Sequence, residues 1–246
     1  MRFERMRPRQ LRDAIEQGVP FVLPIGVMEY HGGHLPVGVD MLAVTEVLAR
    51  LEPEVVLLPP FPYGAASHAV AGPEGTGNLH IDATAIVPFA EGLFNALLRG
   101  GFRNIHGVIH HQTENFAQGM PTDLAFRLAA RNAIFRFLED ERGTGWWGDR
   151  AMRDYYAQHA AGASPFDWIR IHPLFPPGNP YPFDHAGEGE TGLMQALVPE
   201  SVDMARAADG DHWFTETANA GSAARGDEGV SIALAHVRRC LGLSGD

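Results

Sequence analysis

Residues 21–40 read FVLPIGVMEYHGGHLPVGVD, and this stretch decides the fold class. It begins with a short apolar run, Phe21 to Ile25, which is typical of a buried β-strand. After a polar loop the pattern becomes helical, because apolar residues recur at the spacing of one helix face: Leu42, Val44, Val47, Leu48 and Leu51. A strand, a polar loop and a helix in this order are typical of α/β proteins, which place functional side chains where strands end.

The rest of the chain repeats this alternation. Apolar runs at Val55–Leu58 and Asn104–His110 predict further strands, and apolar spacing over residues 83–98 and 122–140 predicts helices. Alternating strands and helices favour a central, mostly parallel sheet flanked by helices. We therefore expect one layered α/β domain over residues 1–246.

The loop of the opening stretch carries four side chains that can bind a metal: Glu29, His31, His34 and Asp40. Carboxylate oxygens and imidazole nitrogens together suit divalent Zn, Mn or Fe. Glu29 and His31 are two residues apart, so in an extended segment they point the same way, as a chelating pair should. Two alternatives stay open. Asp40 has the residue type and position of a helix N-cap, and His34 suits an orienting group as well as a substrate contact.

The string ExHGxHLPxGxD, present here from Glu29 to Asp40, closely resembles the signature of the creatininase (creatinine amidohydrolase) family. The resemblance implies an α/β fold and metal-dependent hydrolysis of small cyclic or amide-like substrates. It also implies that Glu29, His31 and Asp40 are metal ligands, with Asp40 as a candidate bridge between two metals. A later loop, in which Pro73–Thr76 resembles a turn of the family, is expected to be a pocket wall or a connector.

A second polar cluster, HHQTEN, occupies residues 110–115 at the end of a predicted strand. Family members usually have NGHxEN there, so alignment on Glu114 and Asn115 puts Gln112 at the histidine ligand's position and Glu114 at the acidic ligand's. An amide oxygen is a weaker zinc ligand than imidazole, so Gln112 predicts a looser site or a harder ion such as Mn. His110 or His111 could instead fill the position, contact the substrate, or simply be exposed. One bound metal or two are both compatible with this pattern.

A third motif, DHAGEGETGLM, follows a proline-rich run and resembles the family's HGGxxETSLM segment. The resemblance implies that His185 carries a proton, and an imidazole suits that task because its pKa lies near neutrality. Glu190 is expected to orient other groups. Between the second and third motifs, Trp147 lies in an aromatic, glycine-rich segment. We expect it to contact substrate as part of a lid, with a subunit contact or core packing as alternatives.

Composition narrows the classes of partner. A net charge of −11 argues against nucleic acid or an acidic membrane surface, and 45% hydrophobic residues are ordinary for a globular domain. The single cysteine, Cys240, excludes an internal disulfide framework and a cysteine zinc cluster. The basic start has no apolar signal-peptide core, and no run is long enough to span a membrane. We expect a cytoplasmic protein, and the resemblance implies a homo-oligomer, commonly a hexamer.

These observations predict a hydrolase that opens a small cyclic substrate with a metal-activated water. The absence of the family histidine at Gln112 argues against creatininase proper, and the histidine-rich strand end suits a polyhydroxylated ring. The favoured substrate is therefore an oxidised inositol of the 3-dehydro-scyllo-inosose type, opened by carbon–carbon hydrolysis. Cyclic amide hydrolysis is the close alternative. A non-catalytic metabolite-binding protein and isomerisation on the same metal are further alternatives.

Overall fold

The computed structural model describes residues 1–66, 68–70, 77–209 and 211–243, and it contains one central sheet. Four strands pair in the order β2-β1-β3-β4, and every pair is parallel. They are β1 (Phe21–Ile25), β2 (Val56–Leu57), β3 (Ile105–Ile109) and β4 (Ile169–Pro173). Parallel neighbours require a crossover between them, and the helices supply it. The predicted parallel α/β sheet is confirmed, and the expected turn at Pro73–Thr76 lies outside the described residues.

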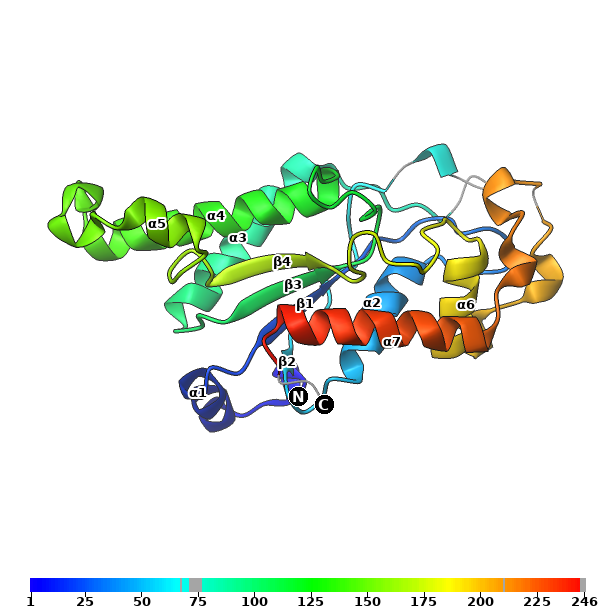
Figure 1. Ribbon diagram of the computed structural model, residues 1–246, viewed down its shortest axis with the longest axis horizontal. Coiled ribbons are helices and arrows are strands. Elements are labelled where there is room, and N and C mark those ends of the chain that lie inside the picture. Colours follow the sequence, from blue (N-terminus) through cyan, green and yellow to red (C-terminus); the bar gives the residue numbers. More distant parts are fainter. Residues whose placement is uncertain (67, 71–76, 210, 244–246) are drawn as a thin grey trace.

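Helices cover both faces of the sheet (Figure 1). α3 (Ala83–Arg99) and α4 (Pro121–Arg142) pack together on one face, where they bury Phe21, Leu23 and Ile25. On the other face α2 (Val39–Ala49), α6 (Glu188–Leu197) and α7 (Ala223–Cys240) pack around Val22 and Val108. This division follows from strand geometry, because successive side chains of a strand point to opposite faces. The short helices α1 (Pro8–Glu16) and α5 (Tyr155–Ala160) lie at the margins.

Close backbone contacts at two glycines hold neighbouring elements together where those elements carry the polar motifs. A Cβ atom on Gly26 would lie 2.6 Å from the backbone nitrogen of Met41, so β1 leads directly against the start of α2. A Cβ on Gly226 would lie only 1.9 Å from the carbonyl oxygen of Gly192, where α6 crosses α7. Only glycine permits contacts this close, since real Cβ atoms need more space.

Register brings two polar segments together at one edge of the sheet. Ile25 of β1 pairs with Ile109 of β3, so both strands end at the same level. The loop after β1 and the polar cluster after β3 therefore begin side by side. None of the helices in the described part of the chain has the length and apolar character that crossing a membrane requires.

Candidate metal centre

The loop after β1 turns Glu29, His31 and Asp40 toward one buried point. Glu29 donates its backbone N–H to Val37 O at 3.0 Å, which closes the loop, and Gly32 supplies a left-handed turn at φ 74°. The His31 Nδ1–H donates to the Glu29 carbonyl at 3.0 Å. Because a carbonyl oxygen only accepts, this bond leaves the lone pair of His31 on Nε2, directed into the cluster.

Asp40 lies in the first turn of α2 and is not its N-cap. The N-cap residue is Gly38, and no side chain caps this helix. Asp40 is 2% exposed, and its Oδ2 has no hydrogen-bond partner. A buried carboxylate oxygen without a hydrogen-bond donor is costly, so this atom needs a neighbouring positive charge, which either a protonated histidine or a metal can supply. The first-turn position also helps, because the amino end of a helix favours negative charge.

The segment after β3 brings His111, and not Gln112, into the cluster. His111 Nδ1 lies 3.2 Å from Asp40 Oδ2 and 3.4 Å from Glu29 Oε1. Its neighbour His110 lies with Nε2 3.4 Å from Glu190 Oε1. Both histidines are buried. Strand alternation alone would separate them, but β3 ends at Ile109 and the backbone then turns.

Gln112 and Glu114, which the sequence alignment predicted as ligands, lie outside the cluster. Gln112 adopts a left-handed backbone conformation with φ 50°, and both side chains are exposed. The turn at Gln112 reverses the direction of the chain immediately after His111. As a result, the two following polar side chains face the surrounding cavity, and neither belongs to a ligand group. An alignment of residue types on Glu114 and Asn115 carries no information about the backbone turn, and His111 was one of the two alternatives that the sequence left open.

Glu190 comes from the first turn of α6 and completes the cluster. Its Oε2 lies 3.4 Å from His31 Nε2 and accepts the backbone N–H of Ala186 at 2.7 Å. Asp184 accepts the backbone N–H groups of Gly189 and Glu190 at 2.6 and 3.2 Å, which fixes the start of the helix. The sequence predicted that Glu190 only orients other groups, whereas the structure brings it within ligand distance.

Two groups of side chains with metal-ligand geometry share Asp40. One consists of Glu29, Asp40 and His111, and the other of His31, Asp40 and Glu190; in each, one ligand atom per residue lies within 4.8 Å of the others. His31 Nε2 and Asp40 Oδ2 are buried and have no hydrogen-bond partner. Orphaned nitrogen and oxygen atoms that converge in this way fit a divalent metal, since metal bonds would satisfy them. The residues therefore fit one or two zinc-like ions.

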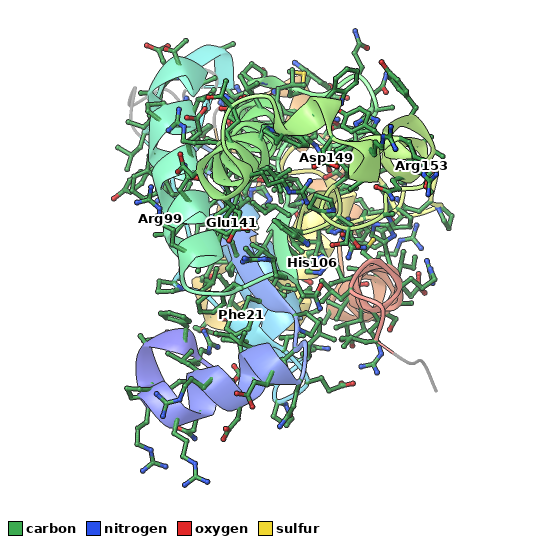
Figure 2. All side chains as sticks on the ribbon, turned by 90° about the vertical axis from the view of Figure 1, so that its left-hand side faces the viewer. Phe21, Arg99, His106, Glu141, Asp149 and Arg153 are labelled. Carbon is green, nitrogen blue, oxygen red and sulfur yellow. The ribbon has the colours of Figure 1, made fainter. Side chains whose placement is uncertain are left out.

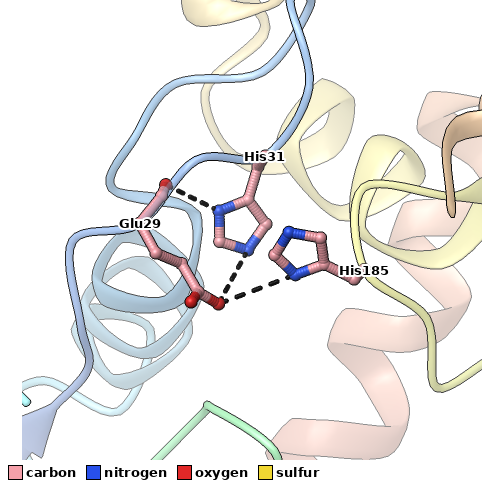
Figure 3. A group of neighbouring side chains, drawn as sticks. All are labelled: Glu29, His31 and His185. Atoms are coloured by element: carbon pink, nitrogen blue, oxygen red, sulfur yellow. Dashed lines mark hydrogen bonds and ion pairs between the residues drawn. The ribbon is translucent and has the colours of Figure 1, made fainter. Parts of the chain in front are cut away.

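His185 lies beside His31 and Glu29 (Figure 3), and its side chain is 23% exposed. Its Nε2–H donates to the Tyr30 carbonyl at 2.7 Å, and its ring stacks on His31 with centroids 4.2 Å apart. The remaining nitrogen, Nδ1, lies 3.6 Å from Glu29 Oε1. Because Nε2 carries the proton, Nδ1 keeps a lone pair next to the cluster. His185 also forms a third candidate ligand group with Glu29 and His31.

The other predicted contacts fall in two places. His34 is buried behind the cluster, where its Nε2 lies 2.9 Å from Thr191 Oγ1 on α6, so it joins the loop to that helix. Trp147 packs on Tyr155 at the far end of α4, with ring centroids 5.6 Å apart. Asp149 and Arg153, which follow it, lie on the side that Figure 2 shows, away from α6 (Figures 1 and 2). Within this chain the segment is therefore no lid over the cluster.

A cavity of about 550 Å³ opens beside His185 and Glu190. Its wall includes Trp213 and Phe214, which the sequence reasoning did not single out. Trp213 is 80% exposed, and the ring of Phe214 packs edge-on against His185 with centroids 5.0 Å apart. The only signal in the sequence was an aromatic pair in a polar segment, HWFTET, which lies outside the three motifs.

The comparisons with known proteins agree with this geometry. A model of the creatininase family, described as creatinine amidohydrolase, matches residues 4–234. The chain belongs to the creatininase family. A creatinine amidohydrolase from Pseudomonas putida is 26% identical over 195 residues, which is 76% of this chain and 68% of that protein.

Solved creatininase structures share the fold. One crystal structure of creatininase has a TM-score of 0.71 at 17% identity and covers 98% of this chain and 96% of its own. A creatininase described as the Mn form gives 0.66 at 18% identity, and a variant described as the Zn-Zn type gives 0.68 at 18%, both with the same coverage. Zinc and manganese are thus the metals of creatininase structures, and this family member has residue groups that fit them.

Charge in the metal-free cluster of this creatininase-family chain is balanced by protons on histidine. Burial alone would lower the pKa of His111, but the carboxylates of Asp40 and Glu29, 3.2 and 3.4 Å from its Nδ1, outweigh burial and raise that pKa to about 10. Burial would likewise raise the pKa of Glu190, but the neighbouring His31, His110 and His185 lower it to about 2. Glu190 is therefore an anion and His111 a cation at neutral pH, and a metal bound by His111 would replace its proton.

Proposed function

We propose that this chain hydrolyses a cyclic amide with a metal-activated water. The single observation that supports this best is the pair of candidate ligand groups that share Asp40, Glu29–Asp40–His111 and His31–Asp40–Glu190. A shared carboxylate between two trios of nitrogen and oxygen ligands suits two divalent ions held close together. A divalent ion held by these residues would lower the pKa of a bound water toward about 7 and would polarise a carbonyl oxygen.

The choice of an amide over an oxidised inositol depends on His111. The sequence argument for carbon–carbon hydrolysis relied on the histidine-rich strand end, which suits a polyhydroxylated ring, and on the loss of a histidine ligand at Gln112. With His111 Nδ1 at 3.2 Å from Asp40, an imidazole is available at the end of β3, so the second of these two grounds loses its support. The same fact weakens the proposal of a non-catalytic binder, which needed a damaged ligand set. The amidohydrolase name of the 26% identical relative adds to the amide proposal.

The chain's own residues supply the proton transfers. We assign the proton carrier to His185, because its Nδ1 lone pair faces the cluster while Nε2–H is fixed on Tyr30 O. A side chain that is 23% exposed and lines the cavity can accept a proton from water and return it to the departing nitrogen. Glu190 and Glu29 hold the negative charge that keeps the ligand imidazoles in position.

Self-association is a further part of the proposal. Large apolar side chains are exposed in the loop before α3 and in the first half of α3; they include Tyr63, Ile81 and Phe89. Four of the residues that line one apolar hollow there are Phe61, Tyr63, Ile81 and Phe89. A patch of this kind supports an interface between copies of the chain. Light scattering of the purified protein measures the mass of the assembly in solution. Phe89→Lys should reduce that mass toward the mass of a single chain.

The experiment that tests the catalytic proposal is mass spectrometry in oxygen-18 water. Metal content is counted first, and the protein is then incubated with creatinine, other cyclic amides and an oxidised inositol. Uptake of one labelled oxygen by an amide supports the proposal, and loss of that activity in Asp40→Asn but not in the exposed Asp13→Asn assigns it to the cluster. Uptake only by the inositol ring, or none in any mixture with metal bound, contradicts the amide proposal.

A further inference from the structure

Gln112 occupies a backbone position that suits glycine. Its φ of 50° lies in the left-handed region, which glycine adopts freely and asparagine or aspartate tolerate better than glutamine. The turn itself is needed, because it lets His111 face Asp40 directly after the strand. A glutamine kept at such a position, where glycine would serve the backbone better, indicates a use for its side chain.

The side chain of Gln112 is placed for contact with a ligand. It is exposed and lines both the 550 Å³ cavity beside His185 and a narrow cavity of about 20 Å³ next to His110 and His111. Glu114 lines the same two cavities. Among the described residues, neither side chain has a hydrogen bond or an ion pair, so an amide and a carboxylate face the cavity unused.

The other residues that line the 550 Å³ cavity indicate which chemical groups a ligand there would carry. Apart from Glu190, which belongs to the candidate metal centre, the cavity's acidic side chains in the described part of the chain are Glu114, Asp184 and Glu216, and the cavity wall has no lysine or arginine there. Phe183, Trp213 and Phe214 add aromatic surface. Carboxylates beside aromatic faces favour cationic groups and N–H donors, and they repel anions.

We infer that Gln112 and Glu114 are specificity-determining residues that bind the part of the substrate away from the scissile carbonyl, and that this part carries a cationic or N–H-donating group. The inference rests on the proposed function, because it takes the cavity beside the cluster as the substrate site. Gln112 contributes an amide that both donates and accepts, and Glu114 contributes the negative charge. The carboxylate of Glu114 also disfavours substrates that carry a carboxylate or phosphate.

Binding of three matched lactams to the zinc-loaded protein tests this without requiring turnover. The probes are 2-pyrrolidinone, its cationic 3-amino derivative and the anionic pyroglutamate, measured by calorimetry. Because the same zinc is present throughout, the measured quantity is the change in the cation-to-anion affinity ratio. Glu114→Lys should shift that ratio toward the anion by about tenfold or more, and Glu114→Gln should shift it less. Glu139→Lys, an exposed site on α4, makes the same change in net charge and should leave the ratio unchanged.

The Gln112→Gly variant distinguishes the contribution of the Gln112 side chain to binding from the effect of its backbone conformation. The variant should keep its metal content and unfold at the same or a higher temperature, yet bind the amino lactam several-fold more weakly. Asp211→Gly relieves another positive φ outside the cavity wall and controls for the backbone effect. Unchanged affinity in Gln112→Gly, an unchanged ratio in Glu114→Lys, or no binding of any lactam would overturn the inference. Hydrolysis without the preference contradicts only this inference, whereas the preference without hydrolysis contradicts only the proposed function.

Discussion

Asp40 Oδ2 and His111 Nδ1 lie 3.2 Å apart, between the first turn of α2 and the end of β3. Neither residue is near the other in the sequence, and the parallel pairing of β1 with β3 brings them together. Asp40 also belongs to the second ligand group, with His31 and Glu190. This one carboxylate therefore joins the two halves of the candidate metal centre.

The number of zinc ions bound per chain should depend on Asp40, because both ligand groups contain this residue. We expect two zinc ions per chain in the native protein, one in His111→Ala, one in Glu190→Gln and none in Asp40→Ala. Each change removes one ligand group or the residue common to both. Mass-spectrometric metal analysis after dialysis against zinc measures this, with the exposed Glu114→Gln as the control that keeps both ions. Full metal content in Asp40→Ala would rule out the shared site.

Metal binding should release a proton from His111. Its pKa of about 10 in the metal-free cluster means that this imidazole is protonated at neutral pH and must lose its proton to bind a cation. Zinc affinity should therefore rise by about tenfold per pH unit below that value, until other groups or hydroxide intervene. Calorimetry in two buffers of different ionisation enthalpy counts the protons released. His111→Ala should release one fewer, and an equal count in both proteins would contradict this prediction.

The stability of the fold should fall in mild acid because of a histidine pair in which His106 is buried and His172 is partly buried. His106 Nδ1 lies 3.0 Å from His172 Nε2 between β3 and β4, at the end of the molecule seen in Figure 2. Burial lowers the pKa of His106 to about 2, and burial with Arg170 and His236 nearby lowers that of His172 to about 4. The folded state thus keeps both rings neutral while the unfolded chain takes up protons.

The direction in which stability changes with pH follows from these pKa values. Above the unfolded value of about 6.5 the two states bind protons equally, and between that pH and about 4 the unfolded state binds more, so stability falls as pH falls. His172 alone should account for about 2–3 kcal/mol over this range. Urea unfolding at several pH values measures it, and His172→Gln should lose less stability between pH 6.5 and 4 than the native chain. Parallel curves for the two proteins would show that the pair does not titrate this way.

The contact between α6 and α7 should not tolerate a methyl group. In Gly226→Ala the new Cβ would meet Gly192 O at 1.9 Å, so the helices must separate, and α6 carries Glu190. We expect a loss of about 1–3 kcal/mol in unfolding free energy together with weaker zinc binding.

Gly92→Ala is the matched control for this substitution. Gly92 lies inside α3, and its Cβ would meet nothing within 4 Å. This change should stabilise the protein by about 0.5–1 kcal/mol, because alanine is the better helix former. Equal effects of the two substitutions on zinc affinity would contradict a role for the α6–α7 contact.

The sequence predicted the α/β class and the half of the candidate site that lies close together along the chain. Glu29, His31 and Asp40 are connected by a short glycine- and proline-rich loop, so their spacing alone constrains them to one region. Three of the four strands, β1, β2 and β3, were predictable for a similar reason, whereas β4 was not predicted. Apolar periodicity is a local property, and the strands and helices it indicated are present.

The tertiary structure decided which residues join that half from a distance. The left-handed turn at Gln112 directs His111 inward and Gln112 and Glu114 outward, and one backbone dihedral angle of this kind leaves no trace in residue types. Packing of α6 against α7 brings Glu190 to His31, and the length of α4 carries Trp147 away from the cluster. Local spacing limits where nearby side chains can go, whereas the positions of distant ones depend on strand register and helix packing across the whole fold.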